Sequence, residues 1–144
     1  MPMLTSATNM LTKRMPKVIS PTAHAVVDYV TAGAFLLSGA FSWSRNKRAA
    51  LAAFVCCGAE LATALLTDYP GGVKRAISFR NHEKIDIGLA AMTATMPEFM
   101  GFRKDRQKAF FLAQAGIMTA VTNLTDFGQI SRERSPRRRR TKAA

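Results

Sequence analysis

The sequence predicts an all-α membrane protein with four transmembrane helices, formed by two tandem helical hairpins. Two observations carry this prediction: four apolar segments of membrane-spanning length, and an internal repeat that aligns residue 24 with residue 82. The chain has 144 residues, 48% of them hydrophobic, with 21 Lys and Arg against 9 Asp and Glu. Because the basic residues gather between the apolar segments, this composition is typical of a small membrane protein with charged loops. It also fits a soluble helical protein with a basic tail that binds nucleic acid.

The first two apolar segments form the first predicted hairpin. The first segment covers about residues 22–43, with Ser20 as the expected N-cap and Pro21 at the first helical position. The second covers about residues 49–66, and its only charge is Glu60. The sequence TDYPGG then ends the helix, because proline and glycine break helices.

The other two segments form the second predicted hairpin. The third covers about residues 81–102, with Asn81 as the expected N-cap and Pro97 bending or ending the helix. The fourth covers about residues 108–128, where Gly128 is the expected C-terminal cap. Each segment of about 18–22 residues spans roughly 27–33 Å as a helix, close to the thickness of the bilayer's hydrocarbon core. Three of the four segments lack the polar stripe of a soluble bundle helix.

The basic loops predict an orientation in the membrane. With four spans, the N-terminal segment, the central loop and the C-terminal tail share one side and carry 13 Lys and Arg, against 7 in the opposite loops. The positive-inside rule therefore predicts a multi-pass protein of the cell (inner) membrane with both termini in the cytoplasm. The predicted organisation is a basic segment at 1–19, a first hairpin at 20–70, a linker at 71–77, a second hairpin at 78–128 and a basic, disordered tail at 129–144.

The internal repeat is the most specific signal in the chain. A single constant shift places His24 on His82 and Asp28 on Asp86 without a gap. The same shift places LTDY, which begins at Leu66, on LTDF. A shared offset over two whole segments indicates duplication of a helical hairpin. Since each copy has two helices, both copies have the same orientation, related by a pseudo-twofold axis along the membrane normal.

A hairpin that opens with Pro-x-x-His-x-x-x-Asp, at Pro21, His24 and Asp28, and ends with LLTDY resembles the SPW-repeat family of small bacterial integral membrane proteins. The resemblance covers about residues 20–128. The family's Ser-Pro-Trp motif, followed by Gly-Phe, is matched in part by MPEFMGF in the second repeat, whereas SGAFSW in the first keeps only the serine. The resemblance implies a four-helix membrane fold and no particular chemistry.

Six ionisable side chains are expected in one polar layer near the cytoplasmic face, where helices of both repeats begin and end. They are His24, Asp28, Asp68, His82, Asp86 and Asp126. The leading interpretation is a pair of hydrogen-bond clamps that close the bundle. In these clamps a neutral imidazole, or the N–H groups of a neighbouring helix start, satisfies each carboxylate, since an unpaired charge at this depth is costly.

A second interpretation of the layer is a divalent metal site, with His24, Asp28, His82 and Asp86 as candidate ligands. A third is a proton or ion path through the two aspartates. Glu60 has no acidic counterpart in the second repeat, where Met118 takes its place. A structural or snorkelling role is therefore the favoured interpretation of Glu60.

The remaining features predict no chemistry. Cys56 and Cys57 are adjacent, form no metal or disulfide pattern and are expected to be small apolar residues. No catalytic constellation and no cofactor motif is recognisable, so a structural or interaction role in the membrane is expected rather than an enzyme. The arginine run at 137–140 predicts attraction to anionic lipid. The expected partners are therefore the lipid bilayer and anionic lipid, with homo-oligomers left open and nucleic acid disfavoured.

Overall fold

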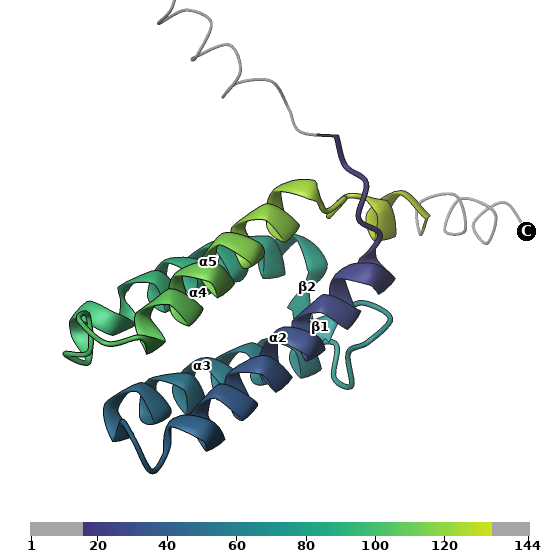
Figure 1. Ribbon diagram of the computed structural model, residues 1–144. Coiled ribbons are helices and arrows are strands. Elements are labelled where there is room, and N and C mark those ends of the chain that lie inside the picture. Colours follow the sequence, from purple (N-terminus) through teal and green to yellow (C-terminus); the bar gives the residue numbers. More distant parts are fainter. Residues whose placement is uncertain (1–15, 134–144) are drawn as a thin grey trace, which may run out of the picture.

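The computed structural model describes residues 16–133 and is mostly helical (Figure 1). Helix α2 packs along α3 and α4 along α5, which confirms the two predicted helical hairpins. The arginine run at 137–140 and most of the basic N-terminal segment lie outside the described residues. The elements are α2 (Pro21–Ser42), α3 (Lys47–Leu66), β1 (Thr67–Asp68), β2 (Ile77–Ser78), α4 (Phe79–Phe99) and α5 (Gln107–Leu124).

The two hairpins begin in the same way. Ser20 caps α2 as predicted, with its side chain accepting a hydrogen bond from the Ala23 N–H at 3.2 Å. The predicted cap of the third helix at Asn81 is wrong. Ser78, the residue that aligns with Ser20, caps α4, and its hydroxyl oxygen accepts from the Asn81 N–H at 3.2 Å. An extended serine whose side chain reaches the third helical N–H is a favoured N-cap, so the duplication extends to the cap.

The C-terminal ends of the hairpins also match each other. Helices α3 and α5 both pass into an extended threonine, Thr67 and Thr125 respectively. The predicted cap at Gly128 is therefore wrong, because α5 ends at Leu124. The predicted disordered tail from residue 129 is also wrong for its first residues. Residues 129–133 are helical, and Ile130 packs against the buried aromatic side chains at this end of the molecule.

Two short parallel pairings join the hairpins to each other. In β1 and β2, Thr67 lies opposite Ile77. An equivalent parallel bridge joins Thr125 to Ile19. The shift of the internal repeat places Ile19 on Ile77 and Thr67 on Thr125, so one pairing is a copy of the other with the ends exchanged, as a pseudo-twofold axis requires. The end of each hairpin is thus tied to the beginning of the other, which brings the first turns of α2 and α4 together.

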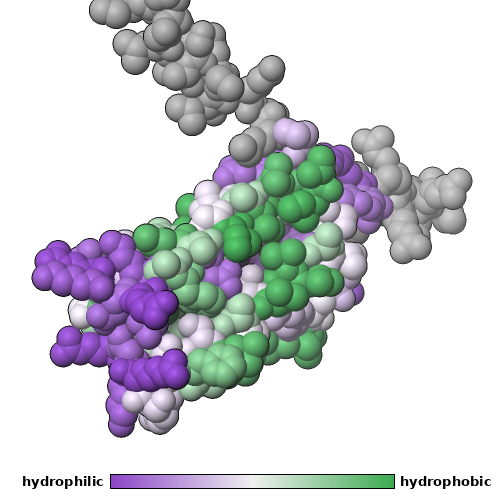
Figure 2. Space-filling model, in the orientation of Figure 1, coloured by the Kyte–Doolittle hydropathy of each residue, from purple (hydrophilic) through white to green (hydrophobic). Residues whose placement is uncertain are grey.

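The helices expose many large apolar side chains, and beside a few buried Phe and Met residues they bury alanines and polar side chains. Phe41 on α2 is 76% exposed and Phe99 on α4 is 83% exposed. Figure 2 shows apolar surface along the flank of the helices and hydrophilic surface at the end formed by the hairpin loops. Within the described residues, α2 and α3 are the two helices long and apolar enough to cross a membrane.

Gly72, in the loop between β1 and β2, makes a close backbone contact. A Cβ atom there would lie 1.8 Å from the carbonyl oxygen of Thr67, which is a backbone atom and cannot rotate away. We expect Gly72→Ala to displace the loop and lower the free energy of unfolding by about 1–3 kcal/mol. The control is Gly33→Ala, whose Cβ would meet nothing within 4 Å. Thermal unfolding of the purified protein measures both, and equal midpoints for the two variants would contradict the prediction.

Candidate metal centre

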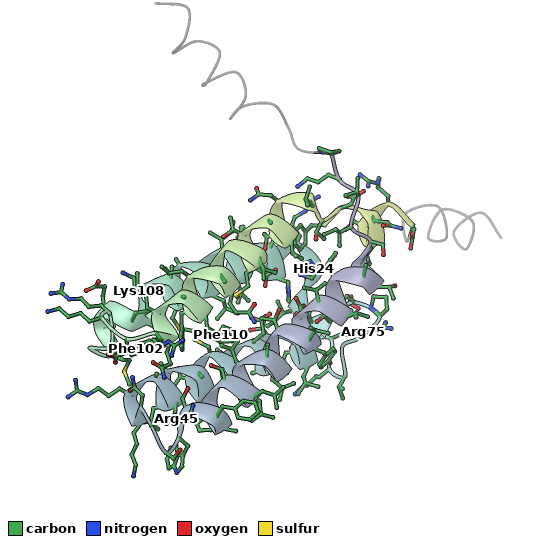
Figure 3. The ribbon with its side chains drawn as sticks, in the orientation of Figure 1. His24, Arg45, Arg75, Phe102, Lys108 and Phe110 are labelled. Carbon is green, nitrogen blue, oxygen red and sulfur yellow. The ribbon has the colours of Figure 1, made fainter. Side chains whose placement is uncertain are left out.

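Four side chains of the predicted polar layer form one buried group, called here the His/Asp cluster: His24, Asp28, His82 and Asp86. His24 and Asp28 lie one turn apart near the start of α2, and His82 and Asp86 lie one turn apart near the start of α4. This spacing places each pair on one face of its helix. The two imidazoles are 1% exposed and the two aspartates 4%. Figure 3 shows His24 pointing from α2 into the space between the two hairpins.

One nitrogen or oxygen atom from each residue of the His/Asp cluster lies within 4.8 Å of the others. The two Nε2 atoms are 3.1 Å apart. His24 Nε2 lies 3.4 Å from Asp28 Oδ1 and 3.0 Å from Asp86 Oδ2. His82 Nε2 lies 3.2 Å from Asp28 Oδ2 and 2.9 Å from Asp86 Oδ1. Each imidazole therefore faces the carboxylate of its own helix and that of the other hairpin.

The other ring nitrogens bond to the threonines that follow the hairpins. His24 Nδ1 lies 2.8 Å from Thr125 Oγ1, and His82 Nδ1 lies 2.7 Å from Thr67 Oγ1. Both hydroxyls also lie 2.7 Å from a main-chain carbonyl oxygen four residues earlier. Since each threonine sits at the end of the opposite hairpin, the two bonds cross between the repeats.

These contacts determine which ring nitrogen of a neutral imidazole carries hydrogen. A carbonyl oxygen can only accept, so each threonine hydroxyl donates its single hydrogen to the carbonyl. The hydroxyl oxygen must then accept from imidazole Nδ1–H. A neutral imidazole with hydrogen on Nδ1 has a bare lone pair on Nε2. The centre of the His/Asp cluster therefore holds two nitrogen lone pairs and two carboxylates, all hydrogen-bond acceptors, which require a cation or added protons between them.

Three buried aromatic side chains cover the cluster on the side of the chain termini. Phe79 and Phe127 lie edge-on to the His24 ring, with ring centroids 5.5 and 5.2 Å away. Tyr69 completes the cover, and its hydroxyl donates a 2.8 Å hydrogen bond to Asp28 Oδ2. Burial, together with the Asp28 carboxylate, raises the pKa of the Tyr69 phenol, so this hydroxyl keeps its hydrogen. The cover separates the cluster from water at this end of the molecule.

Asp68 and Asp126 have other contacts than the sequence suggested. Asp68 pairs with Arg75 at 3.2 Å, and Asp126 pairs with Arg132. Of the two predicted partners for these carboxylates, the N–H groups of a neighbouring helix start stay a prediction. The imidazole is excluded, because both nitrogens of each ring are engaged by threonines and by the His/Asp cluster. The cause is the extended backbone after α3 and α5, in which successive side chains point to opposite sides. The threonine side chain points toward the His/Asp cluster, and the half-buried aspartate after it points to the other side of the backbone.

Sequence reasoning missed Thr67 and Thr125, although a signal for them was present. The shift of the internal repeat aligns the threonine of LTDY with that of LTDF as well as the aspartate. The uncharged residue of each motif contacts the cluster, whereas the charged residue was expected to do so. The missed signal was thus a repeated polar residue one position before a repeated acid.

The crossed bonds predict a matched loss of stability. In Thr67→Val or Thr125→Val the imidazole Nδ1–H loses its acceptor in a buried site, which costs about 1–3 kcal/mol. We expect similar losses for the two variants, because the contacts are equivalent. Thr95→Val is the control, since the exposed Thr95 hydroxyl bonds only to carbonyls of its own helix. Thermal unfolding measures all three variants, and equal midpoints would contradict the assignment of the two threonine–histidine hydrogen bonds.

Comparisons with protein-family models, with curated proteins and with solved structures find no match to this chain.

Proposed function

We propose that this protein is an integral membrane protein of four transmembrane helices that binds one divalent transition-metal cation between its two hairpins. One observation carries the metal-binding part. The two imidazole nitrogens that face each other at 3.1 Å are the ones without hydrogen in the neutral rings, and both face two carboxylates. The residues His24, Asp28, His82 and Asp86 would be the ligands, two nitrogens and two oxygens, a set that suits Zn²⁺.

The distances support a four-coordinate site. With metal–nitrogen distances of about 2.0–2.1 Å, neighbouring ligands of a tetrahedral ion lie about 3.3 Å apart. The nitrogen–nitrogen distance is 3.1 Å, and the nitrogen–oxygen distances run from 2.9 to 3.4 Å when the nearer oxygen of each aspartate is taken for each histidine. One ligand atom from each residue lies within 4.8 Å of the others, so side-chain rotations would have to bring the four atoms closer together around one ion. The threonines at Nδ1 would fix the tautomer and the ring orientation, as partners of metal-bound histidines generally do.

Charge accounting favours a cation over protons. Two carboxylates and two neutral imidazoles carry a charge of −2 in a site shielded from water, and a divalent ion cancels it. Two added protons would also cancel it. On the rings they would place two N–H groups and two positive charges 3.1 Å apart, and on the carboxyls they would form the hydrogen-bond clamp instead. Protonation of one ring leaves a net negative charge buried, which is costly. A divalent ion satisfies both conditions, because it binds the nitrogen lone pairs and cancels the negative charge.

The distribution of side chains supports the membrane part of the proposal. Beside α2 and α3, which have the length and composition of membrane spans, α4 and α5 also expose large apolar side chains, among them Ile87 and Ile117. Beside Phe35, Phe111 and a few other large apolar residues, the interior contains many alanines and polar groups, and with the exposed apolar side chains this suits a lipid environment. Basic side chains such as Arg45 and Lys108 extend from the loop end (Figure 3). We place both termini on the cytoplasmic side, from the positive-inside rule.

In this proposal the cation links the two hairpins. Each hairpin supplies one histidine and one aspartate, so the ion adds to the parallel pairings and the crossed threonine–histidine hydrogen bonds that already join them. We propose a binding and scaffolding role rather than catalysis. The match to the opening Pro-x-x-His-x-x-x-Asp pattern also leads us to propose membership of the SPW-repeat family.

Metal analysis tests the binding site. Detergent-purified protein, loaded with Zn²⁺ and dialysed, is expected to retain close to one ion per chain. The double variant His24→Ala/His82→Ala is expected to retain almost none, while Asp126→Asn, outside the cluster, keeps the parent's content. Thr67→Val is expected to weaken binding by about 10–100-fold through loss of ring orientation. A parent protein with far less than stoichiometric metal, or a double variant with unchanged metal, overturns the metal site.

Extraction of cell membranes with alkaline carbonate tests the membrane part separately. The protein is expected to stay with the membrane pellet, because spanning helices resist this treatment while peripheral proteins are released. An established multi-pass protein and a peripheral protein of the same cells serve as controls. Release into the supernatant would favour the soluble helical alternative, in which α2 and α3 are core helices.

A further inference from the structure

Glu60 on α3 lies outside the proposed ligand set, although it is buried beside it. The residue is 4% exposed, and its Oε2 atom has no hydrogen-bond partner among the described residues. An unpartnered carboxylate oxygen at this burial is costly unless a cation, a proton or a water molecule meets it. Nothing in the sequence connects Glu60 with the histidines, which lie on other helices.

A small cavity connects Glu60 with the His/Asp cluster. Its lining includes Glu60, His24, Asp28 and Asp86. Asp86 Oδ1 is the other buried side-chain oxygen of the described residues that lacks a hydrogen-bond partner, since its neighbour, the bare Nε2 of His82, is also an acceptor. The space available to the centre of a water molecule is ≈ 10 Å³, which is about what one water requires. Both unsatisfied oxygens thus belong to residues that face one water-sized space.

The second repeat shows what this position becomes without the acid. Met118 replaces Glu60 at the equivalent place and lines the same cavity. The Met118 sulfur receives a weak contact from the Thr93 hydroxyl at 3.9 Å. One part of the cavity wall is therefore a thioether with a partner, and another is a carboxylate oxygen without one. The part of the cavity wall formed by Glu60 is therefore the part that lacks a hydrogen-bond donor.

We propose that Glu60 holds a water molecule on the bound cation, giving the metal centre a fifth, exchangeable position that a small anion can occupy. This inference rests on the proposed function. The water would coordinate the ion through its oxygen and donate a hydrogen bond to Glu60 Oε2. Closed four-ligand zinc sites are structural, whereas sites that keep a water position can take up another ligand. Glu60 is then a positioning residue that acts through the water.

The cavity also has a side from which small ligands could arrive. Its lining includes Val27 and Thr31 of α2 and Val121 and Thr122 of α5. Figure 2 shows hydrophilic atoms between the apolar surfaces of these two helices on the viewed face. The cavity therefore extends between α2 and α5, on the side away from the aromatic cover.

Cobalt substitution tests the fifth position, because five-coordinate Co²⁺ absorbs visible light more weakly than tetrahedral Co²⁺. The Co²⁺-loaded parent is expected to show the weaker spectrum, and azide is expected to change it by replacing the water. Glu60→Met copies the second repeat and fills the space, so a stronger, tetrahedral spectrum without an azide response is expected. Glu60→Gln keeps the volume and an acceptor oxygen, and should resemble the parent, as should the exposed control Glu98→Gln.

Three results separate the possibilities. A Glu60→Met spectrum and azide response equal to those of the parent would overturn the inference while leaving the metal site intact. A parent that ignores azide, with Glu60→Gln changed as much as Glu60→Met, would mean direct ligation by Glu60 and would also overturn it. Failure of the parent to bind Co²⁺, or binding unchanged in His24→Ala/His82→Ala, would instead overturn the proposed function. Gel filtration and circular dichroism verify that each variant is folded.

Discussion

The rest of the structure depends on a pair of crossed hydrogen bonds between threonine and histidine. Thr125 at the end of the second hairpin bonds to His24 at the beginning of the first, and Thr67 bonds to His82 in the same way. Each bond holds an imidazole in one orientation and one tautomer. Both rings must then present their second nitrogen to the same point between the hairpins. The parallel pairings beside these threonines hold the two hairpins together at the separation that lets the two rings face each other.

This arrangement explains why ionisable groups lie at the front of apolar helices. The cost of burying two carboxylates is high in any low-dielectric interior and higher beside lipid. Two lone pairs and two negative charges that converge on one point are unfavourable alone and favourable around a divalent cation. A hydrogen-bond clamp made by the same four side chains would need added protons, because no hydrogen is left between the rings in their neutral form. The metal hypothesis therefore gains its support from hydrogen positions as much as from distances.

The duplication explains why the two halves of the His/Asp cluster are alike. Differences between the two repeats explain why the surroundings of the two halves are not. Tyr69 donates to Asp28, whereas its counterpart Phe127 has no hydroxyl to offer Asp86. Glu60 faces the cavity with a carboxylate, whereas its counterpart Met118 offers a thioether. Asp28 thus has a tyrosine donor that Asp86 lacks, and Asp86 has a longer contact of 3.5 Å with the Thr122 hydroxyl. The two halves of the His/Asp cluster therefore differ in their surroundings.

The sequence by itself determined the two hairpins, the first helix cap and the pairing of His24 and Asp28 with their copies, because these follow from local hydrophobicity, capping chemistry and a fixed offset. It misplaced the cap at Asn81 and the end of α5, and it did not predict the pairing of Asp68 and Asp126 with Arg75 and Arg132. Those depend on the extended residues between helices, whose side chains alternate sides according to strand pairing across the two repeats. Only the tertiary structure decided that the threonine turns inward, that both Nε2 atoms converge and that Glu60 shares their cavity. Each of these is a contact between elements far apart in the chain, set by how the hairpins cross and not by any residue spacing.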